Sequence, residues 1–469
     1  MPSGDSIPAL VARAREAFAT REFASQAEVD FICARVAWAG CRENFAKRIA
    51  EQTFAATGIG DVRSKFLKMR KKLKAVYADT VDAKTCDLVE TDAANGLLKY
   101  AKPVGVIGAL IPVTNPEMTP FINALWALKT RNAIILAPHP ASQSVNDMAV
   151  TEIRRVLRKY EWPEDLVIGV SGSSISKSNE LMCSCDLVLA TGGAAMVKAA
   201  YSSGKPALGV GTGNAVMVVD DTVDITDTAT KVMQSKTFDQ ASGCSADNSC
   251  VIQSSAYTGF LRALEAVGGF VIADGSPEKE RLQATMWTER NTLNRKIVAR
   301  PAAVIAEMAQ ISVPTGIRFL VVEESGIGDD FPFSREKLSP VLTVYRWKSF
   351  DSAIEMVNSI TGNCGAGHSC GIYSHDEERI RRLASQVRLA RVTVRQAHAL
   401  ANSGSWSNGL RQTGTLGCGT WGNNAVSENV YFKHLLNLTQ VAFPLDRTEP
   451  SDEEVFGATV IDEFESDVH

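Results

Sequence analysis

From residue 102 onward, short apolar runs alternate with stretches of helical spacing, and this alternation constrains the fold more than any other feature. Glycine, proline or polar turns bound the runs, which is typical of buried strands. Strand, helix and strand repeated in this way require a parallel sheet covered on both faces, with right-handed crossovers. The sequence therefore predicts a Rossmann-type α/β domain with strands at residues 104–111, 133–137, 166–170, 186–190 and 215–219.

A second alternation follows Cys244 and predicts a second α/β domain. Residues 401–424 are rich in Gly, Ser, Asn and Thr and predict a long functional loop. We divide the chain into a first domain of nucleotide-binding type at residues 1–235, a second α/β domain at 236–425 and a C-terminal segment at 426–469. The apolar runs of the second domain lie at residues 250–253, 270–272, 319–322, 340–344, 370–373 and 391–394.

The two ends of the chain carry less information. Residues 7–23 and 27–53 have apolar residues at helical spacing. We expect the first helix to pack on the core, although a helix at this position could also target the protein to a microcompartment. The acidic tail from residue 447 is expected to be partly disordered. A basic cluster in residues 61–79 is interpreted as a solvated helix face: Lys65, Lys68, Arg70, Lys71, Lys72 and Lys74.

Charge and cysteine usage narrow the class of protein. A net charge of −4 gives no electrostatic footprint for nucleic acid. The sequence contains neither a signal-peptide pattern nor an apolar run of membrane-spanning length, so we expect a cytoplasmic protein that does not bind a membrane. The 10 cysteines have no zinc or redox spacing, so we expect reduced thiols and no metal.

Cys244 is the candidate nucleophile. It follows Ala241-Ser242-Gly243, a run with so little side-chain bulk that a substrate and backbone N–H groups could approach the thiol closely. The alternative is a buried structural cysteine, which is the commoner role for this residue type. Cys250 and Cys418 are interpreted as structural, because one begins an apolar strand and the other lies in a glycine-rich packing motif.

Two glycine-bearing turns lie at strand ends in the first domain. Thr191-Gly192-Gly193 precedes a helix and could offer backbone N–H groups to a phosphate. The second turn, Gly209-Val-Gly-Thr-Gly-Asn214, precedes a strand. Neither turn is a G-x-G-x-x-G fingerprint in the right context, so each could equally serve the backbone alone.

An ordered set of motifs resembles the CoA-acylating aldehyde dehydrogenases over residues 100–445. The set consists of Cys244 after Phe238-Asp239, Glu336-Lys-Leu-Ser-Pro-Val341, Gly367-His368, Leu416-Gly-Cys-Gly-Thr-Trp-Gly422 and Val426-Ser-Glu-Asn-Val430. The resemblance implies an aldehyde dehydrogenase-like α/β fold, a cofactor domain, a catalytic domain that begins near the nucleophile and a chain end that returns to the first domain. It also implies a homodimer or homotetramer.

The resemblance assigns roles to individual residues. Cys244 would be the nucleophile, and the Asn115 amide would bind the oxyanion together with the Cys244 N–H. Glu336 would hold the nicotinamide ribose. Thr191 and Gly192 would face the pyrophosphate, Gly209 and Gly211 would lie near the nicotinamide, and the nucleotide cleft would be lined by Ile111, Pro112, His139 and Pro340.

In the reaction that the resemblance implies, oxidation of the aldehyde leaves an acyl group on Cys244 as a thioester. The molecule that accepts this acyl group decides the class of enzyme. Hydrolytic relatives use a glutamate in the segment that matches residues 207–214, and here this segment has no acid. Water needs a base or a metal to attack at neutral pH, whereas a thiol is already partly ionised. We therefore expect coenzyme A to accept the acyl group, in a reaction that can also run backwards as acyl-CoA reduction.

The cofactor and the substrate are predicted less directly. Residues 137–140 offer no acid against a 2′-phosphate, and His139 or Arg131 could bind one, so we expect NADP, with NAD as the alternative. The loop after residues 391–394 lines the aldehyde pocket in this superfamily and here carries polar groups suited to an anion, as in acylating sulfoacetaldehyde dehydrogenases. Succinate semialdehyde, acetaldehyde and propionaldehyde are the alternatives. The candidate anion-binding residues are Arg395, His398, Ser403, Trp406 and Asn408.

Three other functions remain open from the sequence. A redox-silent CoA acyltransferase would use Cys244 without a nicotinamide, but the two glycine turns and Glu336 argue against it. A catalytically inactive binding protein would have no need of Cys244, Asn115 and Glu336 together. A hydrolytic dehydrogenase would require an acid from elsewhere in the chain.

Overall fold

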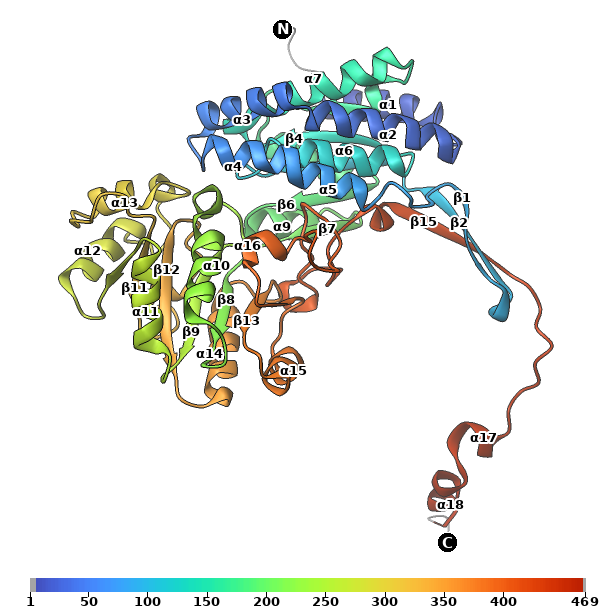
Figure 1. The fold of residues 1–469 in the computed structure, drawn as a ribbon. Helices are drawn as coiled ribbons and strands as arrows, with labels where there is room; N and C mark the ends of the chain where they lie inside the picture. The colour runs from blue at the N-terminus through green and yellow to red at the C-terminus, as the bar shows by residue number, and fades with distance from the viewer. Residues whose placement is uncertain (1–5, 467–469) are drawn as a thin grey trace.

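The computed structural model describes residues 6–466 as two α/β domains, a small antiparallel sheet and a C-terminal arm (Figure 1). This architecture confirms the predicted fold class. None of the helices in this range is both long and apolar enough to cross a bilayer. Within the same range, His, Cys, Asp and Glu side chains do not gather in groups of three that could hold a metal ion.

The first domain is built on a five-stranded parallel sheet of order β5-β4-β3-β6-β7. Its central strands are apolar throughout because helices cover both faces. The strand order reverses between β3 and β6, and the carboxyl ends of strands at such a reversal are where α/β proteins bind ligands. The strands are β3 (Val106–Ile111), β4 (Ala133–Pro138), β5 (Val167–Gly169), β6 (Leu187–Thr191) and β7 (Ala207–Val210).

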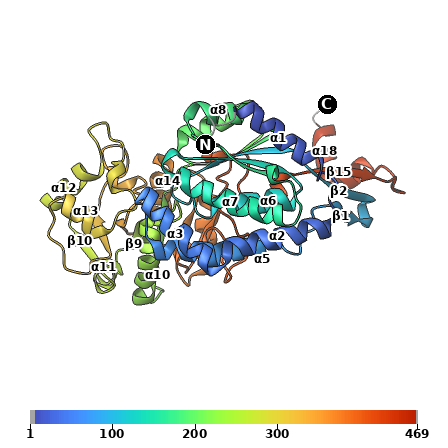
Figure 2. The ribbon, with the colours of Figure 1, turned by 90° about the horizontal axis from the view of Figure 1, so that it is seen from above.

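Helices from the first 80 residues pack over this sheet, with α2 beside α6 and α7 (Figure 2). All 11 residues of α6 are buried. Arg42 separates α2 from α3, so the predicted helix at 27–53 is two helices. The helices are α1 (Ile7–Ala19), α2 (Gln26–Cys41), α3 (Glu43–Thr57), α4 (Val62–Leu67), the π-helix η1 (Lys68–Lys72), α5 (Leu73–Ala78), α6 (Thr119–Lys129), α7 (Gln143–Lys159), α8 (Ile175–Ser184) and α9 (Ala194–Tyr201), with the 3-10 helices η3 (Pro140–Ser142) and η4 (Glu164–Leu166).

The chain leaves the first sheet at the carboxyl end of β7 and enters the second sheet at the amino end of β8, through residues 211–214. The second sheet is parallel and seven-stranded, of order β10-β11-β12-β9-β8-β13-β14. Its strands are β8 (Ala215–Val219), β9 (Asp247–Gln253), β10 (Gly269–Ile272), β11 (Phe319–Glu323), β12 (Val341–Trp347), β13 (Cys370–Tyr373) and β14 (Val392–Val394).

Helices cover both faces of the second sheet. One face packs on α10 and α11, the other on α14 and α15, and the outer strands pack on α12 and α13. Their bounds are α10 (Ile225–Thr237), α11 (Tyr257–Ala266), α12 (Pro277–Met286), α13 (Ala302–Met308), α14 (Phe350–Asn363), α15 (Glu377–Gln386) and α16 (His398–Ala401), with the 3-10 helices η5 (Phe238–Ala241), η6 (Arg295–Ile297), η7 (Pro332–Ser334) and η8 (Thr420–Gly422).

The domain boundary expected at residues 235/236 needs correction. Strand β8 and helix α10 precede that point, yet β8 pairs with β9 and β13, and α10 packs in the core of the second domain. The crossing at residues 211–214 is the true boundary. The sequence pattern did not reveal it, because β8 is as apolar as the strands before it.

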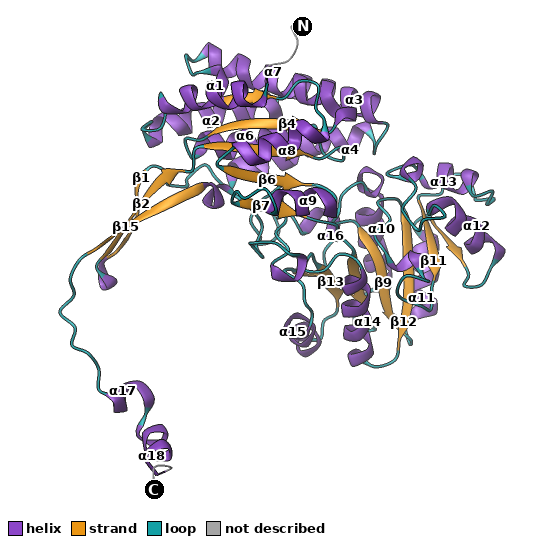
Figure 3. Ribbon diagram, turned by 180° about the vertical axis from the view of Figure 1, so that it is seen from behind, coloured by secondary structure: helices purple, strands orange, loops and turns teal. Residues whose placement is uncertain are grey.

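The C-terminal segment runs back to the first domain. Strand β15 pairs with β2, which pairs with β1, and the three form an antiparallel sheet at the edge of the molecule (Figure 3). Beyond it an extended arm carries α17 and α18, two exposed helices where partial disorder was expected. The elements are β1 (Asp87–Asp92), η2 (Ala93–Asn95), β2 (Leu97–Pro103), η9 (Phe432–Leu435), β15 (Leu436–Ala442), α17 (Asp452–Phe456) and α18 (Ala458–Ser466).

Candidate active site

Cys244 lies where the two sheets face each other. It belongs to the segment that precedes β9. His368 lies two residues before β13, and Arg391 lies directly before β14. The amino edge of the second sheet therefore meets the carboxyl edge of the first, from which Asn115 projects after β3. A cleft of about 410 Å³ opens over Cys244 and includes Asn115 in its lining.

The thiol of Cys244 has one close titratable partner. The His368 Nε2 atom lies 3.2 Å from Cys244 Sγ. Burial raises the pKa of this thiol to about 12, and the nearby Glu336 carboxylate adds to the rise, while Arg391 opposes it. Burial also holds the pKa of His368 well below its usual range, so the imidazole is neutral. The resting pair is a thiol beside a neutral base.

Cys244 is the accessible member of the three cysteines that the sequence set apart. Its side chain is partly exposed, while Cys250 and Cys418 are buried. Burial places the pKa of the Cys250 thiol well above its usual value. Because burial raises the pKa of all three thiols, exposure is the feature that favours Cys244 as the reactive thiol.

The loop that leads to Cys244 has a strained backbone. Asp239, Gln240 and Ala241 all have positive φ, at 50°, 51° and 56°. Residues other than glycine adopt this region rarely, and such strain persists only where surrounding contacts enforce it. The Asp239 side chain provides these contacts, since it accepts hydrogen bonds from the Asp61 N–H at 2.9 Å and the Ser242 hydroxyl at 2.6 Å.

Two lysines of the predicted basic cluster are buried at this loop, which corrects the solvated-face interpretation. Lys65 donates to Asp239 Oδ2 at 2.8 Å, Lys68 donates to the same oxygen, and Glu117 lies within 4 Å of both ammonium groups. Burial alone would raise the pKa of Asp239, but Lys68 and Lys65 hold it below its usual value. This ion cluster ties the nucleophile loop to α4 and η1 of the first domain.

Lys68 also orients the predicted oxyanion residue. Its Nζ atom donates to Asn115 Oδ1 at 2.6 Å. An ammonium group can only donate, so the atom facing it must be the amide oxygen, and the Asn115 NH₂ group is the end left to face other partners. The NH₂ group makes a 3.3 Å contact with the Thr114 hydroxyl.

The crossing at residues 211–214 packs directly against the nucleophile. A Cβ atom on Gly213 would lie 2.2 Å from the Cys244 carbonyl oxygen, so only glycine fits there. This segment contains no acid. The nearest acid is Glu336, whose carboxylate accepts from the Gly213 N–H at 3.0 Å and whose pKa burial raises to about 8.

The residues assigned to cofactor binding lie around the reversal of the first sheet and the facing edge of the second. Ile111 ends β3, Thr191 ends β6 and His139 follows β4. Their roles stay predictions. Arg131, considered as a partner for a 2′-phosphate, is buried and donates to the Ala101 carbonyl at 2.8 Å, so it does not serve the cleft. The remaining members are Pro112, Gly192, Gly209, Gly211, Glu336 and Pro340.

The predicted substrate loop contributes only part of the expected set. Ser403 and Trp406 line the cleft. Asn408 donates to the Gln396 side chain and the Ala401 carbonyl, which shapes the loop instead. Arg395 does not line the cleft, and its guanidinium donates to the Ser374 carbonyl at 2.6 Å. His398 is fully buried behind Cys244 and has both ring nitrogens bonded.

The positive charge on the cleft comes from lysines that the sequence interpretation left on the surface. Lys71 and Lys72 line the cleft, and Lys72 contacts the substrate loop. Lys72 Nζ donates to the Ser403 carbonyl, the Gly404 carbonyl and Gln412 Oε1, all of them uncharged. Burial lowers the pKa of Lys72 to about 7, and Asp79 only partly offsets it. All three donors of the ammonium group are engaged, so an anion in the cleft would interact with its charge through space and not with a free N–H.

Sequence reasoning missed His368, Lys68 and Lys72 as site residues. The motif Gly367-His368 was recognised as a family feature, and an isolated histidine in a glycine-rich turn was the available signal for a base. The sequence does not distinguish the buried lysines from their exposed neighbours, because both kinds occur in the same short run at residues 65–74.

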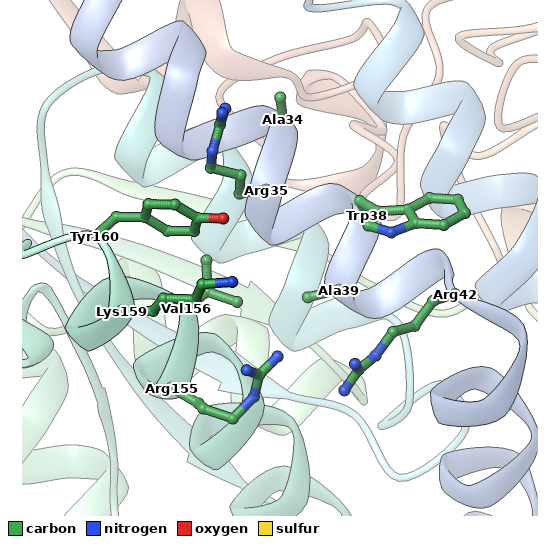
Figure 4. Close-up of a pocket in the computed structure, with 9 residues that line it drawn as sticks. All are labelled: Ala34, Arg35, Trp38, Ala39, Arg42, Arg155, Val156, Lys159 and Tyr160. Atoms are coloured by element: carbon green, nitrogen blue, oxygen red, sulfur yellow. The ribbon is translucent and has the colours of Figure 1, made fainter.

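A second pocket, of about 300 Å³, lies on the outer helices α2 and α7 (Figure 4). Arginine and lysine side chains surround it, and Trp38 is exposed beside it. None of its residues belongs to the cleft around Cys244. Its lining consists of Ala34, Arg35, Trp38, Ala39, Arg42, Arg155, Val156, Lys159 and Tyr160.

Two facing α/β domains with a partly exposed cysteine at their junction are typical of proteins of aldehyde dehydrogenase type. The chain belongs to the aldehyde dehydrogenase family, whose sequence pattern matches residues 6–295 and 328–435. This result confirms the family expected from the motifs.

Similar proteins share nearly the whole chain. It is 42% identical to a sulfoacetaldehyde dehydrogenase of Acholeplasma sp over 92% of this chain and 90% of the relative. It is 40% identical to a sulfoacetaldehyde dehydrogenase (acylating) of Cupriavidus necator over 97% of this chain and 92% of the relative. An acetylating aldehyde dehydrogenase from Geobacillus thermoglucosidasius has the same fold, with a TM-score of 0.90, 33% identity and coverage of 95% and 98%.

Proposed function

We propose that this enzyme oxidises an anionic short-chain aldehyde, sulfoacetaldehyde in the first instance, to its CoA thioester. The Cys244–His368 pair at 3.2 Å, beside a segment that contains no hydrolytic base, is the observation that carries the proposal. The acylating relatives support it, and the reverse reaction, reduction of an acyl-CoA, would use the same groups.

The first step joins Cys244 to the aldehyde. The thiol proton passes to His368 Nε2 as the sulfur–carbon bond forms, and the carbonyl electron pair moves to oxygen. The Asn115 NH₂ group, oriented by Lys68, would stabilise this oxyanion. Loss of a hydride from the tetrahedral carbon restores the carbonyl and leaves a thioester on Cys244. A nicotinamide dinucleotide bound at the first sheet would supply the hydride acceptor.

The absence of an acid at residues 207–214 directs the second step. Water has a pKa of about 15.7 and would need activation, whereas a thiol with a pKa of about 8.5 is already an effective nucleophile. Coenzyme A would attack the thioester carbonyl, the bond to Cys244 Sγ would break, and the sulfur would regain a proton. The products are an acyl-CoA, a reduced cofactor and one released proton.

Lys71 and Lys72 support an anionic substrate. A sulfonate two bonds from the aldehyde carbon, or a carboxylate on a longer chain, would lie in a cleft whose charged lining residues are Lys68, Lys71, Lys72 and Asp239. These lysines replace Arg395 and His398 in the proposal. Succinate semialdehyde is the second candidate, since its carboxylate would meet the same charges.

For the cofactor we propose NADP, with NAD as the alternative. His139 follows β4, and its pKa is lowered by burial and by the positive charge of Arg295, so the potential at this residue is positive. No acid is present in residues 137–140 to repel that phosphate.

The experiment is a comparison of reduction rates of NADP and NAD with sulfoacetaldehyde, succinate semialdehyde and acetaldehyde, each with and without CoA. We expect strict dependence on CoA and a higher kcat/KM for the anionic aldehydes. Turnover without CoA would overturn the acylating assignment, and equal kcat/KM for charged and neutral aldehydes would overturn the anionic substrate. A CoA-dependent acyl exchange with no cofactor reduction would indicate an acyltransferase.

A further inference from the structure

Behind Cys244, an unbroken chain of side-chain hydrogen bonds runs away from the cleft. His368 Nδ1 lies 2.8 Å from Ser369 Oγ, and the same hydroxyl lies 2.8 Å from His398 Nε2. His398 Nδ1 lies 2.6 Å from Thr393 Oγ1. All four residues are buried, and none of them lines the cleft.

The donors and acceptors along this chain can be counted. Burial keeps both imidazoles neutral, with the pKa of His398 lowered to about 3, and Arg391 lowers both values further. Each ring therefore carries one N–H and one bare nitrogen. Ser369 Oγ has a single hydrogen and already accepts one bond from Asn402 Nδ2, at 3.0 Å.

A thiol proton donated at one end would set the direction of every bond. If the Cys244 S–H donates to His368 Nε2, that nitrogen is bare and His368 carries its proton on Nδ1. Nδ1–H then donates to Ser369, the Ser369 hydroxyl donates to His398 Nε2, and His398 Nδ1–H donates to Thr393. Arg391 and Asn402 hold the chain in place, because Arg391 donates to the His368 carbonyl at 2.8 Å and to Asn402 Oδ1 at 3.1 Å.

We propose that Ser369 and His398 are positioning residues that hold His368 in the tautomer whose bare Nε2 faces the Cys244 thiol. The inference rests on the proposed function, in which His368 takes the thiol proton. If His398 were absent, the Ser369 hydroxyl would turn to donate to His368 Nδ1, the His368 proton would move to Nε2, and the thiol would lose its acceptor.

The first test measures the tautomer directly in the unmodified enzyme. The chain has 6 histidines, so ¹⁵N-labelled imidazoles can be assigned by single substitutions in long-range ¹H–¹⁵N spectra. We expect His368 to be protonated on Nδ1. Protonation on Nε2 in the free enzyme would overturn the proposal without any variant.

The second test measures alkylation of Cys244 by iodoacetamide between pH 7 and 9, with peptide mapping and no substrate. We expect His398→Phe and Ser369→Ala each to lower the rate about tenfold, the equilibrium value of one net hydrogen bond. Thr361→Val is the matched control, because it removes a buried hydroxyl that bonds only to its own helix at Val357. We expect Thr361→Val to alkylate at the wild-type rate.

The His368→Ala variant distinguishes failure of the tautomer proposal from failure of the proposed function. If it slows alkylation while both positioning variants react like wild type, the tautomer proposal is wrong and the proposed base stands. If His368→Ala itself reacts like wild type, the base role in the proposed function fails. The melting temperature of each variant is measured alongside, and Ser369→Ala provides the result if His398→Phe does not fold.

Discussion

Lys68 both neutralises a buried acid and orients an amide. Its ammonium group contacts the Asp239 carboxylate in the loop before Cys244 and the Asn115 amide. A buried lysine without partners would lose its charge, and here two acidic side chains compensate it. Lys68 thus orients the amide of Asn115, the proposed oxyanion donor.

Replacing Lys68 by methionine should release the Asn115 amide. We expect kcat to fall about 10²–10³-fold, the usual effect of losing one oxyanion donor, with a smaller change in KM. Steady-state kinetics of Lys68→Met, Asn115→Ala and the double variant measure this. Lys74→Met, an exposed lysine of the same segment, is the control. Fully additive losses in the double variant would contradict the coupling.

Lys72 gives the site a dependence on pH that distinguishes substrates. Its pKa is lowered to about 7, so its positive charge is present below that pH and is lost as the pH rises through it. We expect KM for an anionic aldehyde to rise from pH 6 to pH 8, while KM for propionaldehyde stays level. Lys72→Met should raise KM for the anion about tenfold at pH 6 and remove the pH dependence. A parallel shift for both aldehydes would count against the charge contact.

At the scale of elements, the active site is assembled by strand ends from two sheets. The chain passes from β7 to β8 in four residues, so the carboxyl edge of one sheet must face the amino edge of the other. The loop before β9 is then held to α4 and η1 by Asp239. This contact joins the two domains and also stabilises the strained turn.

Asp239→Asn should destabilise the protein by about 3–5 kcal/mol, because it leaves Lys65 and Lys68 buried without their shared carboxylate. The free energy of unfolding from denaturant titration measures this. The pKa of Asp239 is lowered in the folded state, so its contribution is present above about pH 4 and is lost as the pH falls through the folded value.

The difference between wild type and Asp239→Asn should therefore shrink as the solution is acidified below about pH 4. Asp351→Asn is the control, since Asp351 pairs with Arg382 while 70% exposed and an exposed pair is worth at most about 1 kcal/mol. Equal losses in the two variants would show that the buried cluster has no special role.

For the whole molecule, the C-terminal arm stands apart from the two domains. The last contacts of the arm with the β1–β2 hairpin are made by Phe443 and Arg447, and α17 and α18 are exposed. Their apolar side chains, Val455, Phe456 and Phe464, do not contribute to a domain core within the described residues.

Deleting residues 448–469 should therefore leave catalysis and folding intact. We expect kcat/KM within about twofold and a melting temperature within about 2 °C of wild type, since loss of exposed residues changes stability little. Thermal unfolding and steady-state kinetics test this. A deletion that also removed β15 is the contrasting variant, because β15 pairs with β2 along seven positions and should be needed for folding. A large drop in stability for the shorter deletion would show that the arm has a structural role.

The sequence alone was sufficient for several features that depend on neighbours along the chain. Alternating apolar runs predicted both parallel sheets, the small residues before Cys244 pointed to an approachable thiol, and the acid-free segment at 207–214 predicted a thiol acceptor. The ordered motifs predicted the family. Each of these signals is local, so it can be interpreted without knowing where distant segments lie.

Only the tertiary structure decided which side chains meet across the cleft. Lys72 bonds to a carbonyl 331 residues away, Lys68 reaches Asp239 over 171 residues, and His368 reaches Cys244 over 124. Arg395 and His398 lie in the predicted loop, yet one turns to a carbonyl at its edge and the other is buried behind the nucleophile. The physical reason is that side-chain direction and burial depend on the packing of two domains, which no local pattern encodes.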